Sequence, residues 1–242
     1  MTENAAAPAP AEKANLFDDF VDIFASPGKV FARRTAASPA LPFLIVCGLL
    51  ILMFYVNRGV MASIMDGEIA RSMDAAFKSN PQITADQQAS AKALGQKMAS
   101  ISLVVGAPVA LLCLGLVTWI VGRIFGGALS YGTALMIASF SWIPRVVESL
   151  AGSVQGLLLD TSKMTSRSEL QLGAARFLDP AATPLGLMHL AERVDLFTLW
   201  VTIMLVIGLM SAAKMPKNRM IPAGLTLFVV GSIPALWEIL RS

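Results

Sequence analysis

The stretch "ASFSWIPRVVESLAG", residues 138–152, places two charges and a proline inside an apolar segment. Arg145 and Glu148 lie three residues apart and follow Pro144 directly. Residues at this spacing share a helix face, so we expect the two side chains to form an ion pair. Pro144 lacks a backbone donor and is expected to kink the helix or end it. The environment of the pair depends on the rest of the chain.

The composition of the chain indicates an integral membrane protein. Of its 242 residues, 55% are hydrophobic and 14% are charged, whereas a soluble domain carries roughly 25% charged residues. The net charge of +3 is small and dispersed, so we expect no nucleic-acid partner. Two cysteines and one histidine are too few for a disulfide framework or a metal site, and we expect no metal and no cofactor. The first apolar segment begins near residue 40, so no cleavable signal peptide is expected.

Five apolar segments have about the 20 residues that a helix needs to cross a bilayer. They are about 41–61, 101–121, 134–159, 196–213 and 221–239. The third contains the opening stretch and is the least apolar. Residues 62–98 are predicted to continue the first span and return as a helical hairpin outside the bilayer, with Thr84 and Gln87 as a capping box on the returning helix. The predicted fold is an all-α polytopic membrane protein, with one five-span domain over residues 35–242.

The N-terminal region divides into two parts. Residues 1–14 are small, polar and proline-containing, which is typical of a disordered tail. Residues 15–34 form an amphipathic segment with Asn15 as its expected N-cap. We expect this segment to lie on the membrane surface through Phe17, Phe20, Phe24, Arg33 and Arg34. Packing against the protein's own spans requires the same amphipathic face and is the alternative.

The basic residues of the short loops predict the orientation. The connections around Arg123 and around Lys214–Arg219 contain no acidic residue. Short loops rich in Lys and Arg stay in the cytoplasm. We therefore expect a cytoplasmic N-terminus and, with five spans, a C-terminus outside.

The sequence contains no recognisable catalytic arrangement. The predicted spans contain no aspartate, and the chain has no H-E-x-x-H, G-x-S-x-G or P-loop motif. His189, the one histidine, lies beside apolar residues and is interpreted as an interfacial side chain. We therefore expect no catalytic residues and no enzyme activity; a catalytic role for His189 is the minor alternative.

Arg145, Glu148 and Gln155 are the candidates for a polar path through the bilayer. Charges inside a membrane often mark function, but this pair is also consistent with a structural ion pair or with a helix broken near the interface. Transporters usually show inverted repeats, and the chain shows no convincing internal repeat. Gly122/Gly126 and Gly152/Gly156 are small-xxx-small pairs. We favour packing within the chain for them, with self-association as the alternative.

Three stretches carry a resemblance to a known family. They are "LFDDFVDIFASPGKVF", "GRIFGGALSYGTALMIASFSWIP" and "DLFTLWVTIMLVIGL". Their order and spacing resemble the Yip domain family, membrane proteins named for interaction with Ypt/Rab GTPases, and especially its bacterial members. The residues that match are Ser26, Pro27, Phe31, Gly126, Gly127, Tyr131, Pro144, Asp195, Phe197, Trp200, Gly208 and Leu209.

The resemblance implies five spans, a cytoplasmic N-terminus and, from the eukaryotic members, a role in trafficking or membrane shaping without catalysis. The Asp-Leu-Tyr-Gly-Pro motif and the Tyr-Gly-Tyr-Ser run of the eukaryotic branch are absent, so GTPase binding is not carried over. We expect a membrane-organising scaffold in the bacterial cytoplasmic membrane that engages lipid or a protein partner. The alternative is a transporter, or a subunit of a transport complex, with a polar path at Arg145 and Glu148.

Overall fold

The computed structural model describes residues 15–78, 82–159, 164, 166–180 and 182–240. The expected tail over residues 1–14 and the expected turn at Asn80-Pro81 lie outside these residues. The described part is helical, with one isolated bridge between Gly173 and Asp195. Its α-helices are α1 (Leu16–Ala25), α2 (Pro27–Arg33), α3 (Ala40–Lys78), α4 (Ala85–Ile124), α5 (Tyr131–Ser141), α6 (Ile143–Leu158), α7 (Leu185–Arg193), α8 (Leu196–Ser211) and α9 (Met220–Ile239). The short 3₁₀ helices are η2 (Arg167–Leu170), η3 (Ala174–Phe177) and η4 (Lys217–Arg219).

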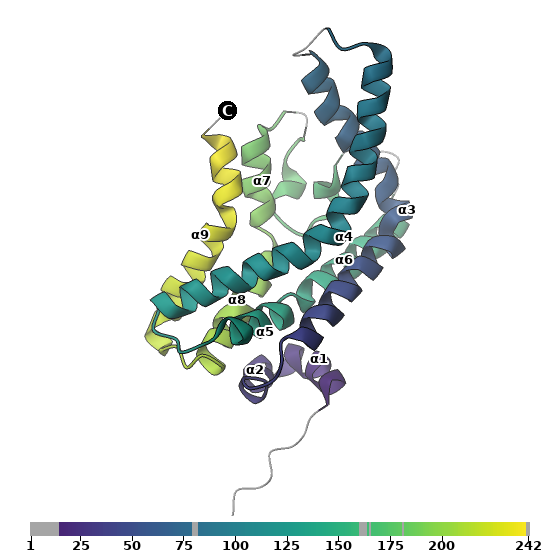
Figure 1. Cartoon of the computed structure of the whole chain (residues 1–242). Coiled ribbons are helices and arrows are strands. Elements are labelled where there is room, and N and C mark those ends of the chain that lie inside the picture. The colour runs from purple at the N-terminus through teal and green to yellow at the C-terminus, as the bar shows by residue number, and fades with distance from the viewer. Residues whose placement is uncertain (1–14, 79–81, 160–163, 165, 181, 241–242) are drawn as a thin grey trace, which may run out of the picture.

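Helices α3 and α4 are much longer than a membrane is thick. They contain 39 and 40 residues, which corresponds to about 60 Å each against a hydrocarbon core of about 30 Å. Figure 1 shows them extending together beyond the other helices at the end opposite to α1 and α2. The predicted capping box is confirmed, because Thr84 and Gln87 each accept a backbone hydrogen bond from the other residue.

Helix α5 is the centre of the bundle. Its residues from Ala134 to Ser141 are all buried, and it packs against α3, α4 and α8. The helix ends at Trp142, and α6 begins at the next residue with Pro144 in its first turn. The break occurs there because Pro144 cannot donate the backbone hydrogen bond that would continue α5. Pro144 therefore ends one helix and starts another within the third apolar segment.

Within the described residues, four stretches are long and apolar enough to cross a membrane. They are Ala40–Gly59, Val104–Ile124, Tyr131–Leu158 and Lys217–Ile239, and Tyr131–Leu158 has the lowest mean hydropathy, 1.2. The fourth predicted span, residues 196–213, corresponds to α8, which has 16 residues, fewer than the roughly 20 of a typical span. The all-helical membrane fold is thus confirmed, whereas the count of five spans is approximate.

Helices α1 and α2 pack beneath α5 and α8 at the lower end of Figure 1. Phe31 is fully buried and meets the ring of Phe140 edge-on, with centroids 6.5 Å apart. Phe24 meets Trp200 edge-on at 5.9 Å. The alternative of packing against the protein's own spans is therefore observed. Phe17 is nevertheless 75% exposed, so α1 also keeps an outer apolar side.

The expected N-cap at Asn15 is confirmed.

Two glycines permit a test of the packing around α5. A Cβ on Gly208 would lie 2.4 Å from the side chain of Ile137, whereas a Cβ on Gly152 would meet nothing within 4 Å. We expect Gly208→Ala to destabilise the protein by about 1–3 kcal/mol, because it overpacks the contact between α8 and α5. Gly152→Ala is the control and should leave stability unchanged or raise it, since alanine favours a helix. Thermal denaturation in detergent measures both; equal melting temperatures for the two variants would contradict the packing described.

Candidate functional site

Arg145 connects α6 to the start of α8. Its Nη1 donates to Glu148 Oε2 at 2.5 Å, and its Nη2 donates to Thr198 Oγ1 at 2.6 Å. Nη1 also lies 3.8 Å from Asp195 Oδ1. The side chains of Arg145 and Glu148 are each 25% exposed. The structure thus brings together the two charges of the opening stretch and adds Thr198 of α8 and Asp195, the N-cap of that helix.

Asp195 fixes the start of α8. Its Oδ1 accepts from the backbone N–H groups of Phe197 and Thr198 at 2.8 and 3.0 Å, and its Oδ2 accepts from the Thr198 hydroxyl. A carboxylate here caps the helix and interacts favourably with the positive end of its dipole. A Cβ on Gly173 would lie 2.6 Å from the Asp195 Cβ. Only glycine lets the connection from α6 approach the start of α8 this closely.

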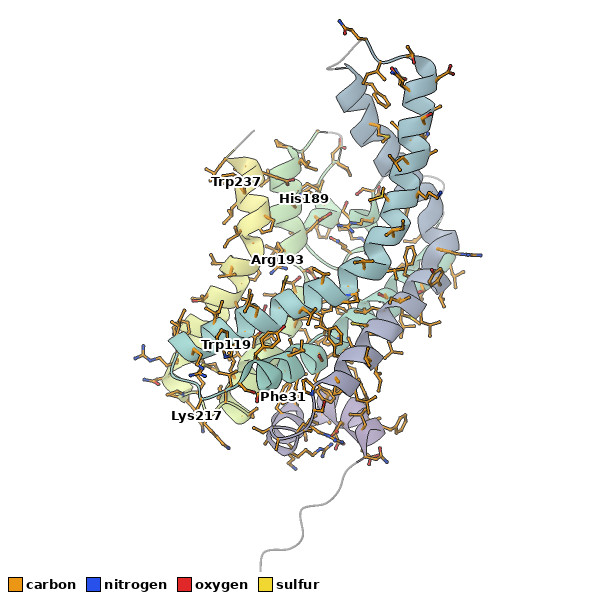
Figure 2. All side chains as sticks on the ribbon, viewed as in Figure 1. Phe31, Trp119, His189, Arg193, Lys217 and Trp237 are labelled. Atoms are coloured by element: carbon orange, nitrogen blue, oxygen red, sulfur yellow. The ribbon has the colours of Figure 1, made fainter. Side chains whose placement is uncertain are left out.

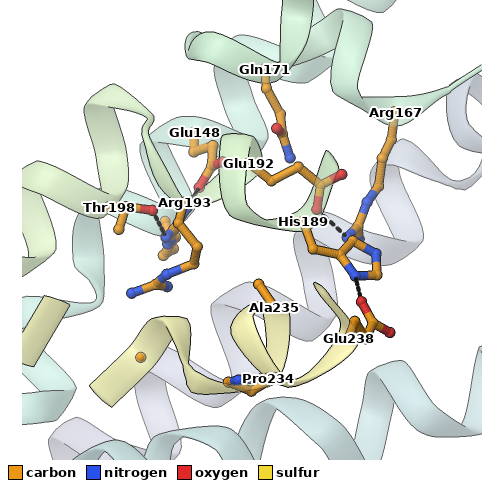
Figure 3. Close-up of a pocket in the computed structure, with 12 residues that line it drawn as sticks. Glu148, Arg167, Gln171, His189, Glu192, Arg193, Thr198, Pro234, Ala235 and Glu238 are labelled. Atoms are coloured by element: carbon orange, nitrogen blue, oxygen red, sulfur yellow. Dashed lines mark hydrogen bonds and ion pairs between the residues drawn. The ribbon is translucent and has the colours of Figure 1, made fainter. Parts of the chain in front are cut away.

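A polar cavity of about 540 Å³ opens beside these residues. Figure 3 shows its lining residues. They come from α6, η2, α7, α8 and α9, and one more, Gln171, directly follows η2. They are Arg145, Glu148, Arg167, Gln171, His189, Glu192, Arg193, Thr198, Gly231, Pro234, Ala235 and Glu238. The cavity contains two further pairs: His189 Nδ1 lies 2.5 Å from Glu238 Oε2, and Arg167 Nη2 lies 3.6 Å from Glu192 Oε2.

Arg193 is held differently from the other arginines of the cavity. It forms no ion pair with the described residues, and its Nε is buried without a hydrogen-bond partner. Its guanidinium lies 5.7 Å from the centre of the Phe228 ring. Burial and the nearby charge of Arg145 lower the pKa of Arg193, and Asp195 partly offsets this effect. Arginine remains protonated in proteins, so the cavity contains a permanent cation that lacks a carboxylate.

The described residues contain no group of three or more metal-ligating side chains. Both cysteines are free; Cys47 is buried and Cys113 is exposed. His189 contacts Glu238 rather than a cysteine. The chemistry that the arrangement offers is the binding of ions and hydrogen-bonding groups.

A second charged cluster joins α1 to α2. Asp19 has no exposed surface and accepts from Nε of Arg33 at 2.5 Å and from Nε of Arg34. Arg33 Nη2 also donates to Asp22 at 2.7 Å. Desolvation alone would lower the pKa of Arg33, but the hydrogen bonds to Asp22 and Asp19 raise it, so this arginine stays charged. Both arginines, expected to face the membrane surface, are directed to carboxylates of their own segment.

The residues of the resemblance lie at turns and contacts rather than in one site. Ser26 and Pro27 separate α1 from α2, and Tyr131 starts α5 and donates its hydroxyl to the Leu112 carbonyl at 3.1 Å. Gly126 has φ +85°, in the left-handed region that favours glycine. A Cβ on Gly127 would lie 3.0 Å from the Gly122 carbonyl. These positions fix how the helices connect.

The model of the Yip1 domain family matches residues 21–237. The chain belongs to the Yip1 domain family. This membership confirms the resemblance and makes the chain an integral membrane protein of the Yip type. Comparisons with curated proteins and with solved structures give no match.

Sequence reasoning missed most of the cavity of this Yip1 domain protein. Arg193 and Glu238 reach it from α7 and α9, and Gln171 from the residue after η2; no local spacing connects them. Thr198 could have been found, because Asp195 and Thr198 stand at the N-cap and N3 positions of a helix start. Gln155, which the sequence suggested for a polar path, instead donates to the Leu170 carbonyl and accepts from Arg176.

Removing Arg145 tests whether its positive charge offsets the cost of burying the negative charge of Glu148. We expect Arg145→Ala to be less stable than the double variant Arg145→Ala/Glu148→Ala by about 1–2 kcal/mol, because the single change leaves Glu148 without its cation. In the double variant Asp195 keeps its hydrogen bonds to helix N–H groups. Thermal unfolding in detergent gives the order of stability. A double variant that melts below Arg145→Ala would show that the pair does not compensate.

Replacing aspartates of α1 tests the second cluster. We expect Asp19→Ala to weaken the docking of α1 and α2 by about 2–3 kcal/mol, because it removes two charge-assisted hydrogen bonds. Asp22→Ala should cost less than about 1 kcal/mol, since the Asp22 side chain is 45% exposed. Limited proteolysis near residue 34 measures docking. Equal cleavage rates in the two variants would contradict a central role for Asp19.

Proposed function

We propose that this Yip1 domain protein is a non-enzymatic scaffold that organises the membrane or recruits a partner. The observation that supports the proposal best is that the residues lining the polar cavity come only from the part of the chain after α5. All its lining residues lie between positions 145 and 238, and none belongs to α1–α5. A scaffold needs a stable shape with exposed contact surfaces, and a bundle packed around α5 provides one.

The region between the cavity and the α1–α2 end is packed with apolar side chains. Ile137, Phe140 and Leu209 have no exposed surface, and Leu205 is 2% exposed. The rings of Phe20 and Phe31 cover Phe140 from below, with centroids at 5.4 and 6.5 Å. A channel needs a polar route that reaches both sides of the membrane at once, whereas a transporter opens its site to one side at a time. No residue of α1–α5 lines the cavity, so a route across the membrane would require this apolar packing around α5 to open in a second state.

We further propose that the α1–α2 end is cytoplasmic and that the membrane is the bacterial cytoplasmic membrane. Figure 2 places Phe31 and Lys217 toward one end of the molecule and His189 and Trp237 toward the other. A Cβ on Gly28 of α2 would lie 3.1 Å from the Ser211 side chain, so the end of α8, from which the basic segment 214–219 continues, lies against α2. This clustering of basic residues supports a cytoplasmic N-terminus and an outer C-terminus.

Two surfaces are available for the scaffold's contacts. On α1, the side chains of Phe17, Val21 and Phe24 are exposed, and they suit a lipid surface or an apolar partner. At the opposite end, the helical hairpin formed by α3 and α4 extends beyond the bundle (Figure 1). We propose that the first surface engages lipid or a partner at the membrane and that the hairpin presents a contact site outside it.

Cysteine accessibility separates a closed bundle from an aqueous path. In a chain whose two native cysteines are replaced, we expect Gln171→Cys in the cavity and Lys97→Cys on exposed α4 to react with a membrane-impermeant thiol reagent. Ser141→Cys, at a fully buried position of α5, should stay unlabelled in intact cells and in broken membranes, because apolar packing excludes water. Mass shifts on a gel give the labelled fraction. If the labelled fraction at residue 141 equals that at residue 97, water reaches the centre of the bundle, and the scaffold proposal would give way to a transport function.

A further inference from the structure

The charges that line the cavity are paired, with one exception. Arg145 pairs with Glu148, Arg167 lies beside Glu192, and His189 contacts Glu238. Those contacts account for all three glutamates of the lining. Arg193 is left without a carboxylate within ion-pair distance among the described residues. A partly buried cation without a partner is costly, and an anion that enters from outside the protein would lower this cost.

Two unsatisfied polar atoms define what such an anion must carry. The buried Nε of Arg193 is a donor without an acceptor, and the buried Oε1 of Gln171 is an acceptor without a donor. Buried polar groups usually have a partner, and unpaired ones are costly. Both residues line the same cavity. An anionic oxygen on a ligand would suit the guanidinium of Arg193, and a hydroxyl or ammonium donor would suit the amide of Gln171.

The position of Arg193 in the fold relates the cavity to the membrane interface. Arg193 ends α7, and α8 begins three residues later at Leu196. Helix α9 lines the cavity through Gly231, Pro234, Ala235 and Glu238, while its neighbouring residues Ile233 and Trp237 are 53% and 54% exposed. Exposed tryptophans are enriched where a membrane protein meets the headgroup layer. The headgroup of a lipid beside α9 could thus reach the cavity while its chains lie along the apolar side of that helix.

We propose that this cavity binds a phosphoryl group, supplied by the headgroup of a phospholipid in the leaflet on the α7 side, with Arg193 as its principal donor. Guanidinium groups bind phosphate oxygens through paired hydrogen bonds, better than a point charge does. The volume of about 540 Å³ lies within the range of roughly 300–1,000 Å³ for small-ligand sites. Because the remaining charges are paired, the site suits a singly charged phosphodiester better than a polyanion.

The position of Gly231 provides a variant that keeps the charge. A Cβ at this residue would lie 2.4 Å from Nη2 of Arg193. Gly231→Ala therefore displaces the guanidinium, which is the flexible end of a side chain, so the helix itself need not move. Arg193→Gln removes the charge. Arg176→Gln is the matched control, because Arg176 is exposed near the cavity, donates to Gln155 and does not line the site.

Native mass spectrometry of the full chain in detergent tests the proposal. We would titrate phosphatidylglycerol, and separately glycerol phosphate and inorganic phosphate, and measure the one-to-one adduct of each. We expect a phosphatidylglycerol adduct whose Kd rises about tenfold or more in Arg193→Gln, equivalent to the loss of one charge-assisted hydrogen bond. Gly231→Ala should weaken the adduct as well, and Arg176→Gln should bind like the unchanged protein.

Each other outcome overturns a stated part of the proposal. One such outcome is that glycerol phosphate or inorganic phosphate gives an Arg193-dependent adduct at least as abundant as the lipid adduct. That result would identify the ligand as a soluble phosphate and exclude a phospholipid. Equal lipid binding in Arg193→Gln and Arg176→Gln would show that the cavity is not the site. The absence of any Arg193-dependent adduct would overturn the phosphoryl site altogether. These results are independent of the scaffold proposal, which depends on the closed packing around Ser141.

Discussion

Arg145 is a permanent charge part-way along a membrane-crossing segment, and the polar half of the structure is arranged around it. The residue lies 14 positions after the start of α5, about 20 Å along the helical path. A charge at this depth requires nearby opposite charge and hydrogen-bond acceptors. Glu148 supplies one from the same helix, whereas Thr198 and Asp195 supply others from α8. The start of α8 must therefore lie beside α6, and Gly173 allows the intervening connection to pass close enough.

This constraint divides the bundle into two unlike halves. On the α7 side of Arg145, polar residues from five elements surround a cavity. On the other side, α5 is enclosed by α3, α4 and α8, and the aromatic rings of α1 and α2 cover its end. The break at Trp142 lies at the boundary, because Pro144 ends the buried helix before the charged residues begin. A local sequence feature thus separates the packed core from the polar cavity.

The parts of the structure that were predictable depend on short-range signals. The capping residues Asn15 and Thr84 were recognisable because each acts within three residues of itself. The helix break at Pro144 follows equally from one residue. The cavity was not predictable, because the partner of His189 lies 49 positions away and that of Arg145 on α8 lies 53 positions away. The burial of Asp19 has the same origin, since the polar side of α1 is covered only when α2 folds back on it.

In the N-terminal helices, ion pairs between arginines and aspartates determine which side chains are left to make contacts at the surface. Arg33 and Arg34 would attract anionic lipid headgroups if their charges were free, but Asp19 and Asp22 bind them. The surface left on α1 is therefore apolar, formed by Phe17, Val21 and Phe24. Contacts made through it depend on burying apolar area rather than on charge, so they respond weakly to salt. At the opposite end the cavity retains Arg193, a cation without a carboxylate at ion-pair distance among the described residues, so contacts there would depend on charge in a way that contacts through α1 do not.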